Sequence, residues 1–296
     1  MFLVSGVQLV VEACKNGIIG TFPSLNGRTA ADFERMLEEI TVELAQWEKV
    51  SGQKAAPFGV NIIVNKTNPR VMEDLAICAK YKVKLIITSL GAVKEVVDFV
   101  HGYGGLVFHD IIKKRHAEKA IEAGVDGIIA VSAGAGGHAG LANPFALVAE
   151  IRSFWTGALV LAGSISTGRD VAAAKILGAD FAYMGTKLIA TQESMASEGY
   201  RQILIDSGID DITYTSAISG VNANFLTKSI AHAGIHLDQK VEEDFSDLHN
   251  ESHSKAWKDV WSAGHGTTTI HEIPTVEKLL STIKEEYIAA IAQLKS

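Results

Sequence analysis

The amino-acid sequence predicts an α/β fold, a parallel (β/α)8 TIM barrel with a helical C-terminal extension. Over residues 1–190, short apolar runs typical of buried strands alternate with helical patterns, which favours a parallel sheet with helices outside it. The last two strands of this series both end in glycine beside hydroxyl residues, and the loops after strands seven and eight are the usual phosphate site of such a barrel. The length of 296 residues, 47% of them hydrophobic, suits one barrel.

The strand count reaches eight only if an apolar stub at the start of the chain is included. In chain order, the expected strands are 1–4, 18–19, 60–64, 85–87, 106–108, 127–131, 158–162 and 181–184. The alternative architecture is an open doubly wound sheet, which would bind its ligand where the strand order reverses. Two glycine-rich strand ends late in the chain favour the barrel.

Helical patterns fill the intervals between these strands, and two of them carry clear start signals. Asn143 followed by Pro144 is an N-cap with proline at the first helical position. Thr167 and Asp170 fit a capping box, and Gly178 fits the stop of the same helix. The expected helices are 30–50, 69–81, 93–100, 113–123, 144–154 and 171–177.

After residue 191 the alternation stops, and we expect a helical extension or lid, 191–296, within a single domain of residues 1–296. A helix at 193–206 would close the barrel, the β-branched run 212–220 would fold back over its mouth, and 238–255 would form a polar loop. Trp257 and Trp261 are four residues apart, so on a helix they would share one face and pack in the core. A terminal helix is expected at 275–294.

The most informative stretch is the glycine-rich loop at 131–140, which directly follows a buried strand and contains one histidine, His138. Glycines let the backbone approach a flat or phosphorylated ligand closely, and a histidine there could act as an active-site base. The alternative interpretation is a tight connection with a solvated histidine.

The next two strand ends have the features of a phosphate site. Residues 163–170 join a strand to a helix start, whose free backbone N–H groups bind anions. The following strand ends in Gly185-Thr186-Lys187, and Arg169 or Lys187 could add positive charge.

Three motifs together resemble the nitronate monooxygenases, formerly called 2-nitropropane dioxygenases, which are FMN-binding barrels. They are Gly136-Gly137-His138-Ala139-Gly140, Ala162-Gly163-Ser164-Ile165-Ser166-Thr167-Gly168-Arg169 and Met184-Gly185-Thr186-Lys187. Gly59-Val60-Asn61 and Gly17-Ile18-Ile19-Gly20 match two earlier motifs of that family. The resemblance implies that His138 is the catalytic base and that FMN is held by Asn61, Gly136, Gly163, Ser164, Tyr183, Met184, Gly185 and Thr186.

The chain departs from the family pattern at several positions. Gly134 replaces a glutamate that is usual in the family, and Val131 replaces a common glutamine. Ser164 replaces the second glycine that is common there, and Lys187 replaces a common arginine. Met1 matches the methionine of an Ala-Pro-Met motif that ends the family's first strand. Most of that strand would then be absent, and we expect residue 1 to be internal to a longer chain.

The resemblance implies FMN-dependent oxidation of alkyl nitronates by dioxygen to a carbonyl compound and nitrite. NADH:quinone reductases and FMN-dependent enoyl-acyl-carrier-protein reductases have similar glycine–histidine loops, so an NAD(P)H-dependent reductase acting on quinones or enoyl thioesters is the alternative. A third class is a flavin-free phosphate-binding barrel or a non-catalytic flavin-binding module.

Composition agrees with a cytoplasmic globular enzyme. The partners expected from the resemblance are a small-molecule substrate, the nitronate, and dioxygen, and a homodimer is possible. The net charge of −7 and the pI near 5.8 give no general attraction to nucleic acid or to anionic membranes. No apolar run is long enough for a membrane helix, and no signal peptide is evident. Cys14 and Cys78 have no metal-binding spacing and are expected to be buried thiols. No metal is expected, although two histidine pairs have helical spacing and His109-Asp110 is a secondary site candidate; the pairs are His232 with His236 and His249 with His253.

Overall fold

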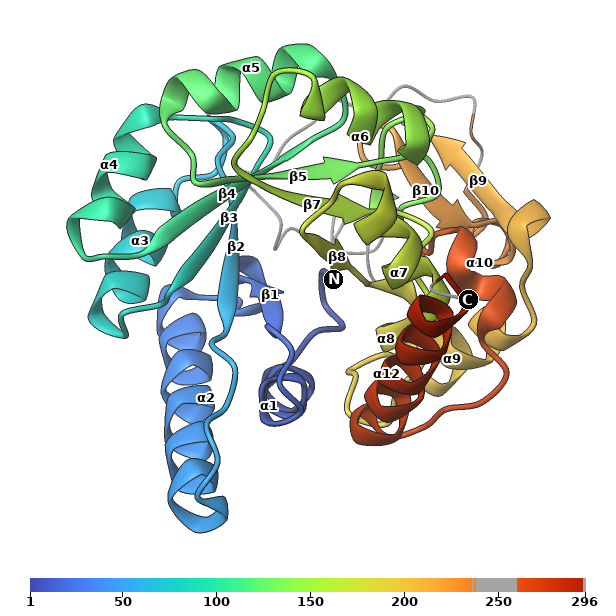
Figure 1. Cartoon of the computed structure of the whole chain (residues 1–296), viewed down its shortest axis with the longest axis horizontal. Helices are drawn as coiled ribbons and strands as arrows, with labels where there is room; N and C mark the ends of the chain where they lie inside the picture. The colour runs from blue at the N-terminus through green and yellow to red at the C-terminus, as the bar shows by residue number, and fades with distance from the viewer. Residues whose placement is uncertain (236, 238–259, 295–296) are drawn as a thin grey trace.

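A computed structural model describes residues 1–235, 237 and 260–294. Its main sheet has seven parallel strands arranged in sequence order, curled into a barrel-like wall with helices outside it (Figure 1). Because the strand order never reverses, the doubly wound alternative is wrong and the barrel prediction is confirmed. The strands are β1 (Thr21–Pro23), β2 (Gly59–Ile63), β3 (Leu85–Ser89), β4 (Leu106–Ile111), β5 (Gly127–Val131), β7 (Ala158–Ala162) and β8 (Phe181–Tyr183).

The expected eighth strand is not formed by residues 1–4, which make a turn instead. Ile18 and Ile19, expected as a strand, lie in a turn before β1 with 48% and 41% of their surfaces exposed. The strand begins only at Thr21, where Thr21, Phe22 and Pro23 pair with residues of β2. Both errors came from short apolar runs, which cannot by themselves distinguish a strand from a partly exposed turn.

The helices that separate the strands follow the expected alternation, whereas the helix at Val7–Lys15 was not expected. α7 begins with the capping box of Thr167 and Asp170 and ends at Gly178 in the left-handed conformation, and Asn143 caps α6. The helices are α1 (Val7–Lys15), α2 (Ala30–Ser51), α3 (Val71–Lys80), α4 (Lys94–Gly102), α5 (Lys114–Ala123), α6 (Pro144–Arg152) and α7 (Gly168–Leu177).

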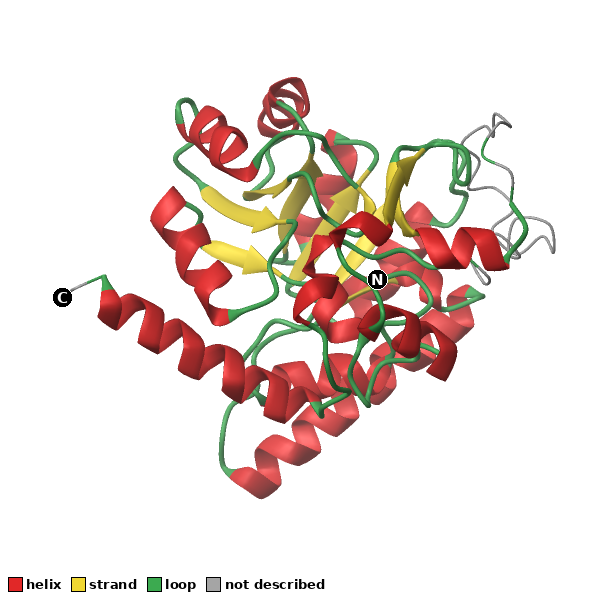
Figure 2. Cartoon of the chain, turned by 90° about the vertical axis from the view of Figure 1, so that its right-hand side faces the viewer, coloured by secondary structure: helices red, strands yellow, loops and turns green. Residues whose placement is uncertain are grey.

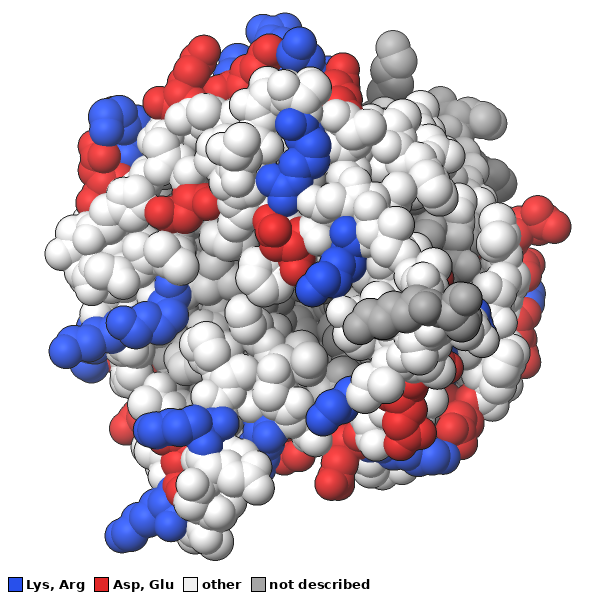
Figure 3. All heavy atoms as spheres, viewed as in Figure 1, with Lys and Arg blue, Asp and Glu red and all other residues white. Residues whose placement is uncertain are grey.

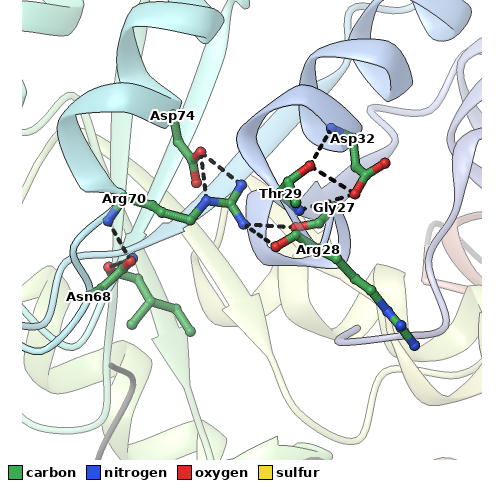
Figure 4. Close-up of polar contacts among 8 residues, drawn as sticks. Gly27, Arg28, Thr29, Asp32, Asn68, Arg70 and Asp74 are labelled. Atoms are coloured by element: carbon green, nitrogen blue, oxygen red, sulfur yellow. Dashed lines mark hydrogen bonds and ion pairs between the residues drawn. The ribbon is translucent and has the colours of Figure 1, made fainter. Parts of the chain in front are cut away.

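The loop between β1 and α2 is fastened to the start of α3 (Figure 4). The guanidinium of Arg70 pairs with the carboxylate of Asp74 at 2.9 Å and donates to the carbonyl oxygen of Gly27 at 2.8 Å. Asp74 is fully buried, and this burial raises its pKa despite the neighbouring guanidinium. The ion pair therefore fixes one of the loops at the barrel mouth, where the carboxyl ends of the strands open.

A second, antiparallel sheet of three strands lies beside the barrel mouth and includes part of the His138 loop. Its strands are β6 (Gly137–His138), β9 (Ile212–Thr215) and β10 (Ala223–Leu226), with β10 in the middle. The run 212–220 therefore does fold back as expected, although only its first four residues form a strand.

The remaining C-terminal elements lie on the same side of the molecule as α7 and this sheet (Figure 1), which is the side that faces the viewer in Figure 2. They are α8 (Thr186–Ile189), α9 (Glu198–Ile205), α10 (Thr227–His232), the 3-10 helix η3 (His265–Thr269) and α12 (Val276–Gln293). Glu286 of α12 accepts a hydrogen bond from the backbone N–H of Gly168 at 2.7 Å, which ties the terminal helix to α7. Trp261 is not helical; it stacks on Tyr200 with ring centroids 4.9 Å apart, while Trp257 lies outside the described residues.

Apolar packing is divided between the barrel interior and the layer between sheet and helices. The interior cluster contains Ile87, Ile129, Val160 and Ala162, with Phe108 and Tyr183 packed against it. Among the described residues, no helix has the length and apolar character needed to cross a membrane.

Candidate active site

One cavity of about 1430 Å³ occupies the barrel mouth and interior. It is lined by every residue that the sequence singled out for catalysis or FMN binding. These are Asn61, Gly136, His138, Gly163, Ser164, Tyr183, Met184, Gly185 and Thr186. The fold thus brings together four segments that are far apart in the sequence.

His138 is held at this cavity by the antiparallel sheet. It pairs with Ala223 of β10. Directly beyond this pair, Ala139 donates its backbone N–H to the carbonyl oxygen of Asn222 at 3.3 Å. Two side chains of the C-terminal extension, one buried and one half-buried, hold the loop in place. The amide of Asn224 donates to the carbonyl oxygen of Ala135 at 2.7 Å, and the hydroxyl of Tyr214 donates to that of Ala139 at 3.0 Å.

Burial lowers the pKa of His138 to about 4. Its imidazole is therefore neutral at pH 7, because the charged form loses its hydration inside the cavity. A neutral imidazole has one N–H donor and one acceptor nitrogen. With so low a pKa, it is better suited to hydrogen-bond an anionic ligand than to remove a proton from a weak carbon acid.

The loops after β7 and β8 have the features of a phosphate cradle. Gly163 and Ser164 both have positive φ angles, 110° and 56°, in the tight turn that follows β7. Ser166 is 3% exposed, lines the cavity, and its hydroxyl oxygen has no hydrogen-bond partner among the described residues. An orphaned hydroxyl beside two glycine-containing turns fits a bound phosphate group.

Neither of the cations expected at this cradle is directed to it. Arg169 bonds to the side chain of Gln293 on α12 at 3.1 Å, and the ammonium of Lys187 donates to the carbonyl oxygen of Thr269. Both cations lie beside the turns in the sequence, but their side chains bond to residues of α12 and η3. A phosphate would therefore depend on backbone N–H groups and hydroxyls.

The segment 262–266, Ser-Ala-Gly-His-Gly, completes the site and was missed by the sequence analysis. The backbone N–H of Gly264 donates to the Thr186 hydroxyl at 2.9 Å, and that of His265 donates to the carbonyl oxygen of Gly134 at 2.9 Å. Two glycines flanking a histidine repeat the character of the 136–140 loop, and that similarity was the available signal.

The same segment explains why position 134 has no side chain. Gly134 has a φ of +82°, and a Cβ there would meet the Ser164 hydroxyl and lie 2.7 Å from Nδ1 of His265. The glutamate usual in the resembled family would therefore clash. His265 and Ser164 occupy the space that a larger residue at 134 would need.

A ladder of polar side chains crosses the opposite wall of the barrel. The amide of Asn61 on β2 donates to the Ser89 hydroxyl on β3 at 2.7 Å, and Ser89 donates to the Asp110 carboxylate on β4 at 2.6 Å. Burial raises the pKa of Asp110 to about 6, although the Ser89 hydrogen bond opposes the shift. Because successive residues of a strand face opposite sides, His109 is directed differently, hydrogen-bonded to Thr88 at 2.7 Å, and burial lowers its pKa to about 4.

Metal binding gains no support from the described residues. No group of three or more His, Cys, Asp or Glu side chains within residues 1–235, 237 and 260–294 could hold a metal ion. His236, His249 and His253 lie outside these residues. Cys14 and Cys78 are buried free thiols, and burial raises the pKa of Cys14 to about 11.

The molecular face in Figure 3 shows acidic and basic side chains intermixed around a central hollow, rather than gathered by sign. Charges of both signs close together give a weak long-range field.

Comparisons with known proteins place this site in context. The family model described as nitronate monooxygenase matches residues 29–286. A nitronate monooxygenase of Paraburkholderia phytofirmans is 35% identical over 129 residues, which are 40% of this chain and 35% of the relative. A dehydrogenase of Rhodococcus jostii that acts on a 5-hydroxy-7a-methyl-1-oxo-octahydro-1H-indene-4-carboxyl-CoA is 28% identical over 182 residues, 60% of this chain and 51% of the relative.

A solved structure has the same fold as this chain. The crystal structure of a nitroalkane oxidase from Streptomyces ansochromogenes superposes with a TM-score of 0.81 at 21% identity, covering 98% of this chain and 94% of that one. The matched segments span about half the length, or less, of the two curated relatives.

Proposed function

The chain belongs to the nitronate monooxygenase family and is an oxidoreductase, and we propose that it uses FMN to oxidise alkyl nitronates with dioxygen. The observation that carries this proposal is a single cavity that combines a phosphate cradle, on the β7 and β8 loops, with the neutral imidazole of His138.

FMN would be held at its two ends by different elements. The turns at Gly163–Ser164 and Gly185–Thr186, with the orphaned hydroxyl of Ser166, would take the phosphate group. Asn61 and the close-packed backbone of Gly136 would contact the remainder. When bound, the flavin supplies the electron transfer, while the protein supplies position and electrostatics.

His138 would bind the nitro group of the substrate. A nitronate is already an anion, so no proton has to be removed from carbon, and a neutral imidazole with a pKa of about 4 can act as a hydrogen-bond donor. Its N–H would donate to a nitro oxygen. In the net reaction, two nitronate anions and one dioxygen give two carbonyl compounds and two nitrite ions, with dioxygen as the electron acceptor and no proton released.

The products test this proposal directly. The FMN-loaded protein is incubated aerobically with ethyl nitronate, and nitrite and acetaldehyde are measured. We expect equal amounts of the two products and a large loss of turnover in His138→Asn. Unchanged turnover in that variant would remove His138 from the reaction, and absence of nitrite with FMN bound would refute the nitronate substrate.

A second candidate function is supported by the dehydrogenase of Rhodococcus jostii, whose substrate is a coenzyme A thioester. Under this alternative, the chain would be an NAD(P)H-dependent flavin reductase acting on enoyl thioesters or quinones. Steady oxidation of NADPH in the presence of a quinone or of crotonyl-CoA, without nitrite formation from nitronates, would favour it.

A further inference from the structure

Asp110 is a carboxyl group inside the barrel, at the end of the polar ladder that begins at Asn61 and passes through Ser89. It lines the main cavity next to the interior cluster of Ile87, Ile129 and Val160. Within the part of the chain that the structure describes, burial and the Ser89 hydroxyl alone account for its pKa, and no cation contributes. A carboxylate buried without a cation costs stability, and such groups concentrate at functional sites.

The polar ladder of Asn61, Ser89 and Asp110 lies across the barrel from the phosphate cradle. The ladder is carried by β2, β3 and β4, whereas the cradle follows β7 and β8, at the far end of the strand order. An elongated ligand that is anchored by its phosphate at β7 and β8, and that extends over the barrel mouth, would present its other end to the ladder. In FMN, that other end is the ring system, whose imide N–H is a hydrogen-bond donor.

We propose that Asp110 faces the flavin ring and sets its reduction potential through the charge of its carboxyl group, an inference that rests on the proposed binding of FMN. Asn61 and Ser89 act as positioning residues in this arrangement. The Ser89 hydroxyl occupies one carboxylate oxygen of Asp110, and the other oxygen is available to the ligand.

The physical reason is the charge that the flavin gains on reduction. A carboxylate close to the ring repels the added electrons and lowers the reduction potential, whereas a protonated carboxyl does not. Because the pKa of Asp110 is about 6, this effect operates at pH 8 and disappears at pH 5.

Other groups of the cavity titrate as well, so the test compares variants at each pH. β2, β3 and β5 present uncharged side chains around Asp110, β8 presents Tyr183, and the loop with β6 presents His138. Asp110 raises the pKa of Tyr183, which places the two side chains within electrostatic reach. The cavity is also lined by Met1, Lys84, His109, His116, Lys119, Lys175 and Asp180. Their contributions cancel when two proteins that share them are compared.

The experiment measures the reduction potential of bound FMN by equilibration with a reference dye, for the wild-type chain and for Asp110→Asn, at pH 5 and pH 8. We expect the variant to have the higher potential at pH 8, and the two potentials to converge at pH 5. At pH 8 the two reduction potentials should differ by at least about 30 mV. For a two-electron couple, this corresponds to a tenfold change in the ratio of the FMN dissociation constants of the oxidised and reduced forms.

Two further variants make the result specific. Ser89→Ala removes the donor that stabilises ionised Asp110, so its potential should lie above that of the wild type at pH 7 and meet it again only at higher pH. Asp98→Asn changes an exposed carboxylate on α4 that pairs with Lys94, and it should match the wild type throughout. If Asp110→Asn fails to retain FMN, the Ser89→Ala shift alone decides the question.

Equal potentials for Asp110→Asn and the wild type at pH 8, or the same difference at both pH values, would overturn the inference. The measurement needs no substrate. A chain that binds FMN and shows the predicted shift, but does not oxidise nitronates, would therefore refute the proposed substrate and leave the role of Asp110 standing.

Discussion

The hydroxyl groups of Thr21 on β1 and Tyr183 on β8 lie 2.7 Å apart. These strands are the two edges of the seven-stranded sheet, so a side-chain hydrogen bond connects edges that no backbone ladder joins among the described residues. Tyr183 also lines the cavity. The contact that brings the edges of the curled sheet together is therefore part of the wall of the site.

Removing this hydrogen bond should weaken the closure measurably. We expect Thr21→Val to lower the free energy of unfolding by about 1 kcal/mol, because the Tyr183 hydroxyl is left without this partner. A double-mutant cycle with Tyr183→Phe checks the pairing: the double variant should be less destabilised than the sum of the single changes. Strict additivity would show that the two hydroxyls do not interact.

The Arg70–Asp74 pair should contribute more to stability, because its carboxylate is fully buried and the guanidinium is only 14% exposed. Arg70→Ala leaves a buried carboxylate unpaired and should cost about 3–5 kcal/mol in denaturant unfolding. Lys94→Ala breaks a pair whose side chains are 68% and 58% exposed, and it should change stability by less than about 1 kcal/mol. Similar losses in both variants would contradict the account of the clamp in Figure 4.

The segment 262–266 should matter for FMN binding through backbone contact alone. A Cβ at Gly264 would collide with the carbonyl oxygen of Gly134 and lie 2.8 Å from the backbone nitrogen of Gly136. Gly264→Ala should therefore displace the segment and weaken FMN binding at least about tenfold, measured by fluorescence titration. The control is Gly208→Ala, where a Cβ meets nothing within 4 Å. Unchanged FMN affinity in Gly264→Ala would remove this segment from the site.

Asp110 should make stability depend on pH in an unusual direction for an aspartate. Its folded-state pKa of about 6 is above the ordinary value, so the folded state binds the proton more tightly and stability falls as pH rises from about 4 to 6. Asp110→Asn removes this cost and should stabilise the flavin-free protein by up to about 3 kcal/mol at pH 8, with little gain at pH 4. A loss of stability at pH 8 would mean that the ionised carboxylate is compensated after all.

His138 should leave no trace in the pH profile of nitronate oxidation near neutrality. Because burial lowers its pKa to about 4, the imidazole of the free enzyme stays neutral from pH 6 to 9. We therefore expect the pH profiles of kcat/KM for ethyl nitronate to have the same shape in the wild type and in His138→Asn between pH 6 and 9. A limb near pH 6.5 that disappears in the variant would show that His138 titrates as an exposed imidazole does.

Much of the barrel could be predicted because its signals are local. The strands at 127–131 and 158–162 and the capping box at Thr167 and Asp170 match the structure to the residue. The strand expected at 18–19 was placed too early because Ile18 and Ile19 are apolar but exposed, while Thr21, which pairs with β2, is polar.

Long-range pairing explains what the sequence could not show. β6 is only two residues long, and its partner Ala223 is distant in sequence, so no periodicity reports it. Arg169 and Lys187 were expected to add charge to the cradle, but the partners that they bond to, Gln293 and Thr269, belong to the extension. The sequence analysis placed His109 and Asp110 together, just after a strand that ends at residue 108. In the structure β4 extends to Ile111, and its alternation directs the two side chains to different partners.

The most direct test of the central proposal is an absorbance spectrum of the purified protein after loading with FMN, followed anaerobically by ethyl nitronate and, in a separate sample, NADPH. The account predicts protein-bound flavin bands that are bleached by the nitronate and left unchanged by NADPH. Bleaching by NADPH alone would contradict it in favour of a reductase, and failure to retain FMN would contradict the assignment of the cavity itself.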